Sequence, residues 1–402
     1  MRVLIFAYAC EPDKGSEPGA GWVWSRMLAR LGDVWVITRE SNKSALEHVL
    51  GHTPERASMH FEYVDLPQWA RFWKRGVRGA RLYYLLWQVA ALRRARRLRH
   101  EKKFELTWHL TWANAWLGTL ASMLEGRFVY GPVGGGMGMD WRLVGVVGFR
   151  GAVYEIGRAL ARGGARYLNP LARLAWRRAD LILTQNPETI AWLPRAHRGK
   201  AHVFPHIVLD ERTRAPAQHR VEHNNRQALF VGRLLGWKGV SLCLRTIALL
   251  PEWRLIVAGS GYDERRLRRL SRRLRVSDRV DFLGWVPASR LADLMRESDV
   301  LLFPSIHDEG GWVIAEALAS GLPVVCLDRG GPPVLGGTGV TPSTVPGTAR
   351  ALSRAVVAAD RRAVGRFPTI SDSTDRLGTL LRARFPTLES AIEANGGSRG
   401  KR

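Results

Sequence analysis

The chain has 402 residues, of which 46% are hydrophobic, so it is long enough to bury two cores and two domains are expected. A formal net charge of +25 and a pI near 11.1 indicate an anionic partner: nucleic acid, anionic lipid or a phosphorylated substrate. The three cysteines have neither metal-ligand nor disulfide spacing, which favours a reduced cytoplasmic setting. No stretch approaches the ~18 apolar residues of a transmembrane helix.

Strand-like runs alternate with helical segments through the first half of the chain. The opening run at 3–8 is too short for a signal peptide, and acidic, glycine-rich residues follow it, so we expect a first strand there. Further strands are predicted at 34–38, 60–64, 106–110, 128–130 and 181–184.

A polar stretch at 210–227 separates this series from a second one. Strands are predicted again at 228–231, 254–258, 280–283, 300–303 and 324–327, with helices between them. Two such series predict two Rossmann-like domains that face each other. We assign residues 1–210 to an N-terminal Rossmann-like domain and 211–375 to a C-terminal one. Residues 376–402 are expected to form a C-terminal helix, able to pack back on the N-terminal domain, and a disordered tail.

The segment FPSIHDEGGWVIAEALASGLPVVC (303–326) carries acids where the pattern otherwise indicates burial. It predicts a strand, a helix at 311–320 that Gly321 ends, and another strand. Asp308 and Glu309 fall in the loop at the carboxyl end of the first strand, where ligands bind in doubly wound folds. Glu316 falls inside the apolar helix and needs a donor, either a ligand hydroxyl or a nearby arginine.

Two other stretches could hold phosphate. FVGRLLGWKGV (230–240) places Arg233 and Lys238 after a strand, where they either clamp a diphosphate or are solvated surface cations. VAGSGYDERRLRRL (257–270) places Gly259 and Gly261 before a helix, where they allow close approach of a phosphate or simply make a tight turn.

Together these motifs resemble the retaining glycosyltransferases of the GT-B fold, in particular glycosyltransferase family 4. Asp308 stands where that family usually has a glutamate, and its separation from Glu316 is the family's, so we assign it as the first acid with Glu309 as the alternative. The residues that fit the donor motif are Pro304, Ser305, Asp308, Glu316, Ala317, Gly321 and Pro323. In the first half ACEPDKGSEPGAGW (9–22), ELTWHLTWAN (105–114) and GPVGGG (131–136) also resemble this family.

The resemblance implies an α/β GT-B fold with two Rossmann-like domains across a cleft, in which residues 1–210 would form the acceptor-binding domain and 211–375 the nucleotide-sugar donor-binding domain. It implies retaining transfer of a sugar from a nucleoside-diphosphate sugar to an acceptor hydroxyl, on a lipid-linked saccharide or another envelope glycan precursor. No metal and no cofactor are implied, because Arg233 and Lys238 would neutralise the departing diphosphate. Glu316 would accept hydrogen bonds from ribose hydroxyls, and Asp308 would lie beside the donor sugar.

The same resemblance supplies the site residues. His109 aligns with a family histidine that touches the donor sugar, and the alternative is a histidine packed among aromatic neighbours. The catalytic set is Asp308, Glu316, His109, Arg233 and Lys238. The donor-binding set is Gly19, Gly21, Gly232, Arg233, Lys238, Gly259, Gly261, Asp308, Glu309, Gly310, Gly311 and Glu316.

The stretch QWARFWKRGVRGARLYYLLWQVAALRRARRLRH (68–100) interleaves aromatic and basic residues. Basic helices with aromatic anchors lie in membrane interfaces and prefer anionic lipid. The alternative is a core helix with its arginines in solvent. We expect peripheral contact with the inner face of a membrane through Trp69, Phe72, Trp73, Arg75, Arg78, Arg81 and Trp87.

Two competing functions account for less of the sequence. A basic nucleic-acid-binding protein would leave the acid pair and the glycine loops unexplained, and no helix-turn-helix, zinc or RNA-binding signature is present, so no nucleic-acid partner is expected. A nucleotide-sugar epimerase of GT-B architecture would share the fold but lack the Arg–Lys pair together with the acid pair.

Overall fold

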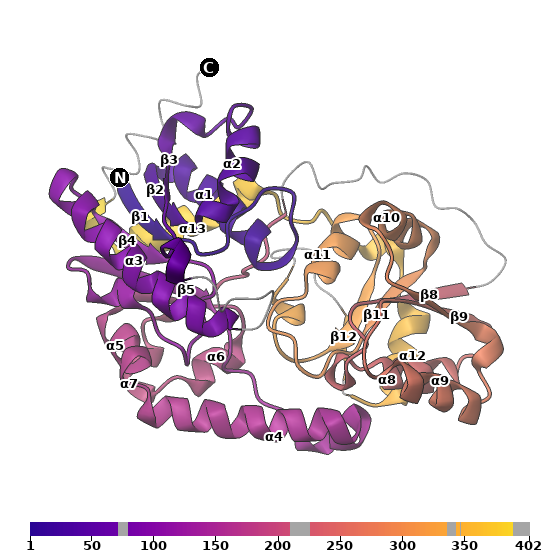
Figure 1. Cartoon of the computed structure of the whole chain (residues 1–402). Helices are drawn as coiled ribbons and strands as arrows, with labels where there is room; N and C mark the ends of the chain where they lie inside the picture. Colours follow the sequence, from indigo (N-terminus) through magenta and orange to yellow (C-terminus); the bar gives the residue numbers. More distant parts are fainter. Residues whose placement is uncertain (71–78, 210–225, 336–342, 346, 389–402) are drawn as a thin grey trace.

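Two parallel β-sheets, one in each domain, lie side by side in the computed structural model (Figure 1). The structure describes residues 1–70, 79–209, 226–335, 343–345 and 347–388. The N-terminal sheet has the order β3-β2-β1-β4-β5-β6-β7 and the C-terminal sheet the order β10-β9-β8-β11-β12-β13, and all pairs of neighbouring strands are parallel. The predicted fold of two Rossmann-like domains is confirmed.

The N-terminal sheet is buried on both faces because successive residues of its strands point into different cores. In β1, Val3 and Ile5 belong to one apolar cluster with α1 and α13, whereas Leu4 and Phe6 belong to a second with α3 and α5. The strands are β1 Arg2–Phe6, β2 Asp33–Thr38, β3 Met59–Tyr63, β4 Leu106–His109, β5 Arg127–Val133, β6 Leu181–Thr184 and β7 Ala201–Val203. The helices are α1 Ser16–Leu31, α2 Lys43–Leu50, α3 Ala80–Glu101, α4 Val144–Leu168, α5 Pro170–Arg178, α6 Pro187–Trp192 and α7 Arg195–Arg198.

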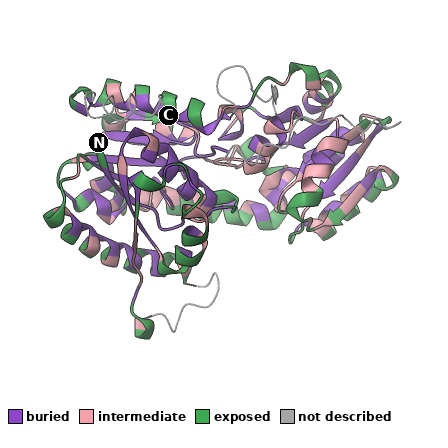
Figure 2. Ribbon diagram, turned by 90° about the horizontal axis from the view of Figure 1, so that it is seen from above, coloured by how far each residue is buried: buried purple, intermediate pink, exposed green. Residues whose placement is uncertain are grey.

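The C-terminal sheet is covered in the same way at its centre, and its central strands are mostly purple in the view coloured by burial (Figure 2). Its strands are β8 Arg226–Val231, β9 Trp253–Ala258, β10 Val280–Gly284, β11 Val300–Phe303, β12 Val324–Leu327 and β13 Ser343–Val345. Its helices are α8 Val240–Ile247, α9 Glu264–Arg273, α10 Ala288–Glu297, α11 Trp312–Ala319 and α12 Ala349–Ala358. The edge strands β7 and β13 were not predicted; each is three residues long and has little apolar pattern.

The chain returns to the N-terminal domain at its end. Helix α13 (Ile370–Arg384) starts with a capping box between Thr369 and Asp372 and packs along α1, with Leu377 and Leu381 in the same apolar cluster as Leu28. This helix begins earlier than the predicted residue 376, inside the range assigned to the C-terminal domain. The tail predicted to be disordered, after residue 393, and most of the predicted linker lie outside the described residues.

Helix α4 connects the two domains. Its first half lies against the C-terminal domain, where Tyr154 stacks on Trp237 with ring centroids 4.5 Å apart and the Ser241 hydroxyl donates to the carbonyl of Val146. Its other end contacts α5 of the N-terminal domain. Across the described ranges, no helix is both long enough and apolar enough to cross a membrane.

Candidate functional site

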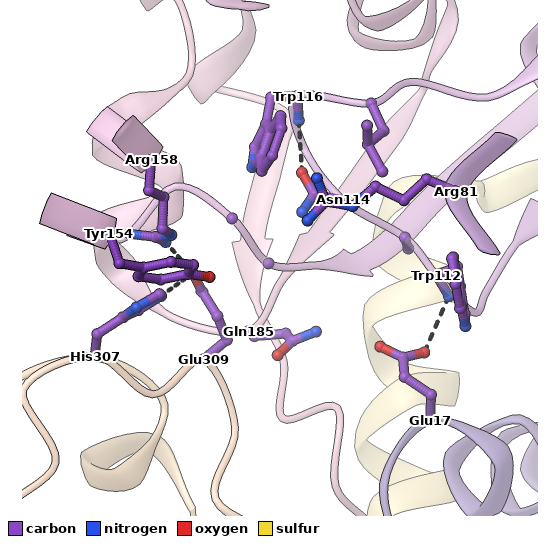
Figure 3. A pocket seen from close by; sticks show the side chains of 14 residues that line it. Glu17, Arg81, Trp112, Asn114, Trp116, Tyr154, Arg158, Gln185, His307 and Glu309 are labelled. Carbon is purple, nitrogen blue, oxygen red and sulfur yellow. Dashed lines mark hydrogen bonds and ion pairs between the residues drawn. The ribbon is translucent and has the colours of Figure 1, made fainter. Parts of the chain in front are cut away.

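A cavity of about 370 Å³ lies between the two domains, at the carboxyl ends of the parallel strands (Figure 3). Its walls come from the loops that follow β4, β5, β6 and β11 and from helices α1, α3 and α4. This is the edge of the sheets where ligands bind in doubly wound folds. The side chains that line it are Glu17, Arg81, Trp112, Asn114, Trp116, Leu117, Tyr154, Arg158, Gln185, His307 and Glu309, together with Ala113, Gly134 and Gly135.

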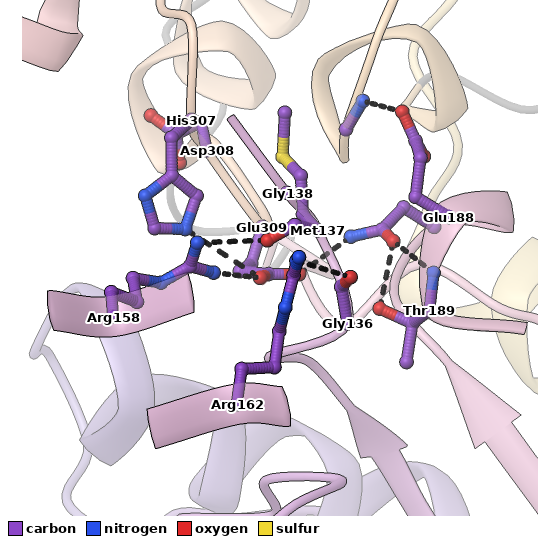
Figure 4. A network of polar contacts seen from close by, with 12 residues as sticks. Gly136, Met137, Gly138, Arg158, Arg162, Glu188, Thr189, His307, Asp308 and Glu309 are labelled. Atoms are coloured by element: carbon purple, nitrogen blue, oxygen red, sulfur yellow. Dashed lines mark hydrogen bonds and ion pairs between the residues drawn. The ribbon is translucent and has the colours of Figure 1, made fainter. Parts of the chain in front are cut away.

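A polar network at one wall of the cavity joins the domains (Figure 4). Glu309, in the loop after β11, accepts hydrogen bonds from Asn186 Nδ2 at 2.7 Å and from Arg158 Nη2 at 3.3 Å. His307, from the same loop, places its Nδ1 3.1 Å from Glu155 Oε1 of α4 and its Nε2 3.7 Å from Glu309 Oε1. Arg158 and Glu155 both belong to α4, so this helix meets the acidic loop with one side chain of each sign.

The charges of this network stabilise one another. Burial favours the neutral form of Glu309, but the hydrogen bond with His307 and the neighbouring Asn186 and Arg158 outweigh it and lower the pKa of Glu309. The pKa of Glu155 is lowered in the same way, against burial, by His307 and Arg158. For His307 burial opposes the charged form, yet the two carboxylates raise its pKa above the ordinary value. The network therefore favours two carboxylates and an imidazolium.

Asp308 does not line the cavity. Its carboxylate lies 2.5 Å from Lys238 Nζ, and both side chains are largely buried. Lys238 ends the short 3-10 helix η7 (Gly236–Lys238) after β8, and Asp308 follows β11, the neighbouring strand. Two predicted residues 70 positions apart are thus in contact. Arg233, between β8 and η7, is exposed.

Glu316 lies in the middle of α11, as predicted, with most of its surface covered. Burial raises the pKa of Glu316 from 4.5 to about 7. Its carboxylate makes no hydrogen bond or ion pair with any residue that the structure describes. The sequence left two possible partners, a nearby arginine and a ligand hydroxyl. No arginine among the described residues pairs with Glu316.

The predicted glycines pack protein backbone against protein backbone. Gly19 and Gly21 lie inside α1, and a Cβ on Gly21 would be 2.0 Å from the carbonyl oxygen of Ala9. In the C-terminal domain a Cβ on Gly259 would be 2.0 Å from the carbonyl oxygen of Gly232, so the loops after β8 and β9 touch here. Gly261 packs similarly against this loop, and Gly310 and Gly311 connect Glu309 to the start of α11.

The prediction that His109 touches a donor sugar is wrong in this structure. His109 is fully buried at the end of β4, with Nε2 2.9 Å from the Tyr84 hydroxyl and Nδ1 2.9 Å from the Thr119 hydroxyl. Both ring nitrogens are therefore occupied by protein. Burial lowers the pKa of His109 to about 3, which keeps the ring neutral. The alternative of a packed core histidine is correct.

The membrane assignment of residues 68–100 is also wrong in part. Trp87 is fully buried in α3 and its indole N–H donates to the carbonyl of Val64 at 2.8 Å, so it belongs to the core. Arg81 lines the cavity, and Trp69 is 79% exposed. Phe72, Trp73, Arg75 and Arg78 lie outside the described residues.

Several residues of the cavity were not predicted. Trp112, Asn114 and Trp116 follow β4 in the stretch ELTWHLTWANAW, where a run of aromatic and amide side chains after a strand was the available signal. Arg158 gave no signal in the sequence, because a single functional arginine cannot be distinguished from the others in a chain with 61 lysines and arginines. Over the described ranges, no group of three or more His, Cys, Asp or Glu side chains is arranged to hold a metal ion.

In comparison with known proteins, the family match lies in the C-terminal half of the chain. Residues 211–358 match the family model of "Glycosyl transferases group 1". A "D-inositol 3-phosphate glycosyltransferase" of Mycobacterium bovis is 37% identical over 155 residues, which cover 36% of this chain and 32% of that protein. The chain thus spans about a third of the length of the curated relatives it matches.

Solved structures match over almost the whole chain. The lipopolysaccharide outer core galactosyltransferase WaaB, in its apo form, aligns with a TM-score of 0.60 and 13% identity over 96% of this chain and 100% of its own. Anabaena Alr3699/HepE, in complex with UDP and glucose, aligns with a TM-score of 0.53 and 18% identity over 99% and 98%. The protein therefore has the GT-B fold, with a C-terminal domain that matches the glycosyl transferases group 1 family.

Proposed function

We propose that the protein is a glycosyltransferase that moves a sugar from a nucleoside-diphosphate sugar to a hydroxyl of an acceptor. The observation that carries this proposal is the match of residues 211–358 to glycosyl transferases group 1, because this stretch contains Arg233, Lys238, Asp308 and Glu316. The HepE structure, which shares the fold, holds UDP and glucose, and this supports a nucleotide-sugar as the donor.

The C-terminal domain would bind the donor. Lys238 pairs with Asp308 after β8, and Arg233 is exposed between β8 and η7, which supports a role for both cations in binding a diphosphate. Glu316 has a largely buried carboxylate with no donor among the described residues, and vicinal hydroxyls of a ribose would supply one. Two cations at the leaving group would stabilise the charge that develops on the diphosphate, a role that needs no divalent ion.

The cavity between the domains, which the N-terminal domain lines for the most part, would take the acceptor. Trp112 and Trp116 offer aromatic faces, and Asn114, Gln185 and Glu17 offer polar atoms, a mixture suited to the faces and hydroxyls of a sugar ring. We further propose that the acceptor is a lipid-linked saccharide or another envelope glycan precursor, handled at the inner face of a membrane. We also propose that transfer retains the anomeric configuration, and anomeric analysis of the product would test this.

Calorimetric titration with nucleoside diphosphates and their sugars tests the donor site. Arg233→Ala and Lys238→Ala should each remove a charge-assisted contact and weaken binding by about 1.5–3 kcal/mol. Arg254→Ala is the matched control, since Arg254 is a cation of the same domain that pairs with Asp281 instead. Equal losses in all three variants would indicate a general charge effect, and no binding of any nucleotide-sugar would remove the proposal.

A further inference from the structure

Helix α4 presents large apolar side chains to solvent on one face. Its residues 149, 153, 156, 160 and 167 are spaced by four, three, four and seven, which places them on one side of a helix. We call them the α4 stripe: Phe149, Val153, Ile156, Leu160 and Tyr167, with exposed fractions of 84%, 54%, 48%, 73% and 69%. Single exposed apolar residues are common on protein surfaces, but a continuous stripe along a helix marks a contact surface.

The opposite face of the same helix is polar and faces the protein. Glu155 and Arg158 take part in the network at the cavity, and Arg162 donates to the carbonyl of Gly136 at 2.9 Å. Helix α4 is thus oriented with its charged side chains inward and its apolar stripe outward. The described residues leave these five side chains largely exposed, so a partner outside them has to account for the stripe.

The charge around the stripe selects the partner. Arg150 on α4 and Arg173, Arg177 and Arg178 on α5 are exposed, whereas the one acid of α4, Glu155, is buried in its pair with His307. Two copies that met through this surface would bring their arginines together, in a chain with a net charge of +25. Anionic phospholipid would be attracted by the arginines and would accept the apolar side chains at the headgroup boundary. We propose that the α4 stripe docks the protein on an anionic membrane surface.

This geometry would bring the cavity to the lipid. Tyr154 and Arg158 line the cavity from α4, while the stripe points away from it on the same helix. A membrane along the stripe would therefore be separated from the cavity by the thickness of one helix. The idea that the membrane supplies the acceptor rests on the proposed function. The docking itself does not depend on activity.

A second helix offers the matched control. The solvent face of α3 carries Leu82, Leu85, Leu86 and Val89, which are exposed by 54%, 40%, 40% and 38%. These side chains are apolar and lie in the stretch first predicted to contact the membrane, but Leu85, Leu86 and Val89 are less exposed than any residue of the α4 stripe. A variant with three of them replaced removes similar chemistry from the other helix.

Vesicle flotation separates these possibilities. The full chain is mixed with vesicles of phosphatidylcholine alone or with phosphatidylglycerol added, at low and high salt. Wild type should float with the anionic vesicles and keep a salt-resistant fraction. The variant F149S/L160S/Y167S should lose about tenfold in the bound-to-free ratio, and L85S/L86S/V89S should bind as wild type does.

Three outcomes would overturn the proposal. They are equal flotation with both kinds of vesicle, undiminished flotation of the α4 variant, or loss confined to the α3 variant. Circular dichroism melting of both variants shows that a loss is not caused by unfolding. Sedimentation without vesicles tests the other occupant: dimers of wild type that the α4 variant lacks would assign the stripe to a second copy. Because no sugar or nucleotide is present, failure here leaves the proposed activity untouched.

Discussion

Replacing Glu316 by glutamine should stabilise the free protein. Burial raises the pKa of this carboxyl from 4.5 to about 7, so the folded protein binds a proton there that the unfolded chain releases. Stability should therefore fall as the pH rises from 4.5 towards 7, and stay constant above it. A shift of this size corresponds to about 3 kcal/mol. Glutamine is uncharged and nearly the same size, and it avoids this cost at every pH.

Urea unfolding of wild type and Glu316→Gln at about pH 5 and about pH 8 measures the effect. The variant should be more stable by up to about 3 kcal/mol at the higher pH and nearly equal to wild type at the lower. It should also bind the nucleotide-sugar more weakly, because an amide accepts less strongly from ribose hydroxyls than a carboxylate does. A variant that gains stability and loses binding is the result expected for a binding residue that has no partner among the described residues.

Glu309→Gln is the matched control, since Glu309 is also buried but has partners that lower its pKa. Its contribution is present above the ordinary pKa of 4.5 and is lost only as the pH falls through the lowered pKa, so this substitution should destabilise by roughly 3 kcal/mol at about pH 8 and by a similar amount at about pH 5. The two glutamates should thus give effects of opposite sign. A Glu316→Gln variant that is less stable than wild type, or equally shifted at both pH values, would mean that the carboxylate is paired or solvated.

Two further predictions concern the acidic loop. His307→Gln should loosen the contact between the domains, which would be measured as faster hydrogen exchange in α4 below pH 6.5, the ordinary pKa of His307. In wild type, His307 should contribute its full stabilisation of this contact below that pH, and the stabilisation should be lost as the pH rises through the raised pKa. Exchange in α4 that is the same in variant and wild type would contradict this. Asp308→Asn should weaken binding of nucleoside diphosphate, because Lys238 loses the partner that positions it, whereas Glu309→Gln should leave this binding unchanged and slow transfer; the reverse pattern would exchange the two roles.

The sheets could be predicted because their strands are apolar on both faces. Such a strand is a continuous apolar run in the sequence, whichever helices cover it. The strands at 300–303 and 324–327 are examples. The contact of Lys238 with Asp308 could also be predicted from the positions of the strands. Each residue comes after a strand, and the carboxyl ends of neighbouring parallel strands lie at one edge, so β8 and β11 bring their loops together.

The role of α3 could not be read from its sequence. Tyr83, Tyr84 and Trp87 share one side of the helix, and an aromatic side with arginines around it suits a membrane interface and a protein core equally well. The structure places this side of α3 in the core, because Tyr8, two residues after β1, packs edge-on against both Tyr84 and Trp87, each with ring centroids 5.1 Å apart. That contact joins residues far apart in the chain, and local periodicity carries no information about it.

The orientation of helix α4 could not be predicted from its sequence either. A helix with one apolar and one charged face normally buries the apolar one. In α4 the charged face is inside because each of its polar groups meets a complementary one: Arg158 reaches Glu309 and the carbonyl of Met137, and Glu155 reaches His307. These partners come from the loops after β5 and β11. Because buried charge is tolerated only where such partners converge, the inward charged face points to the site, and the apolar face is left for a surface outside the protein.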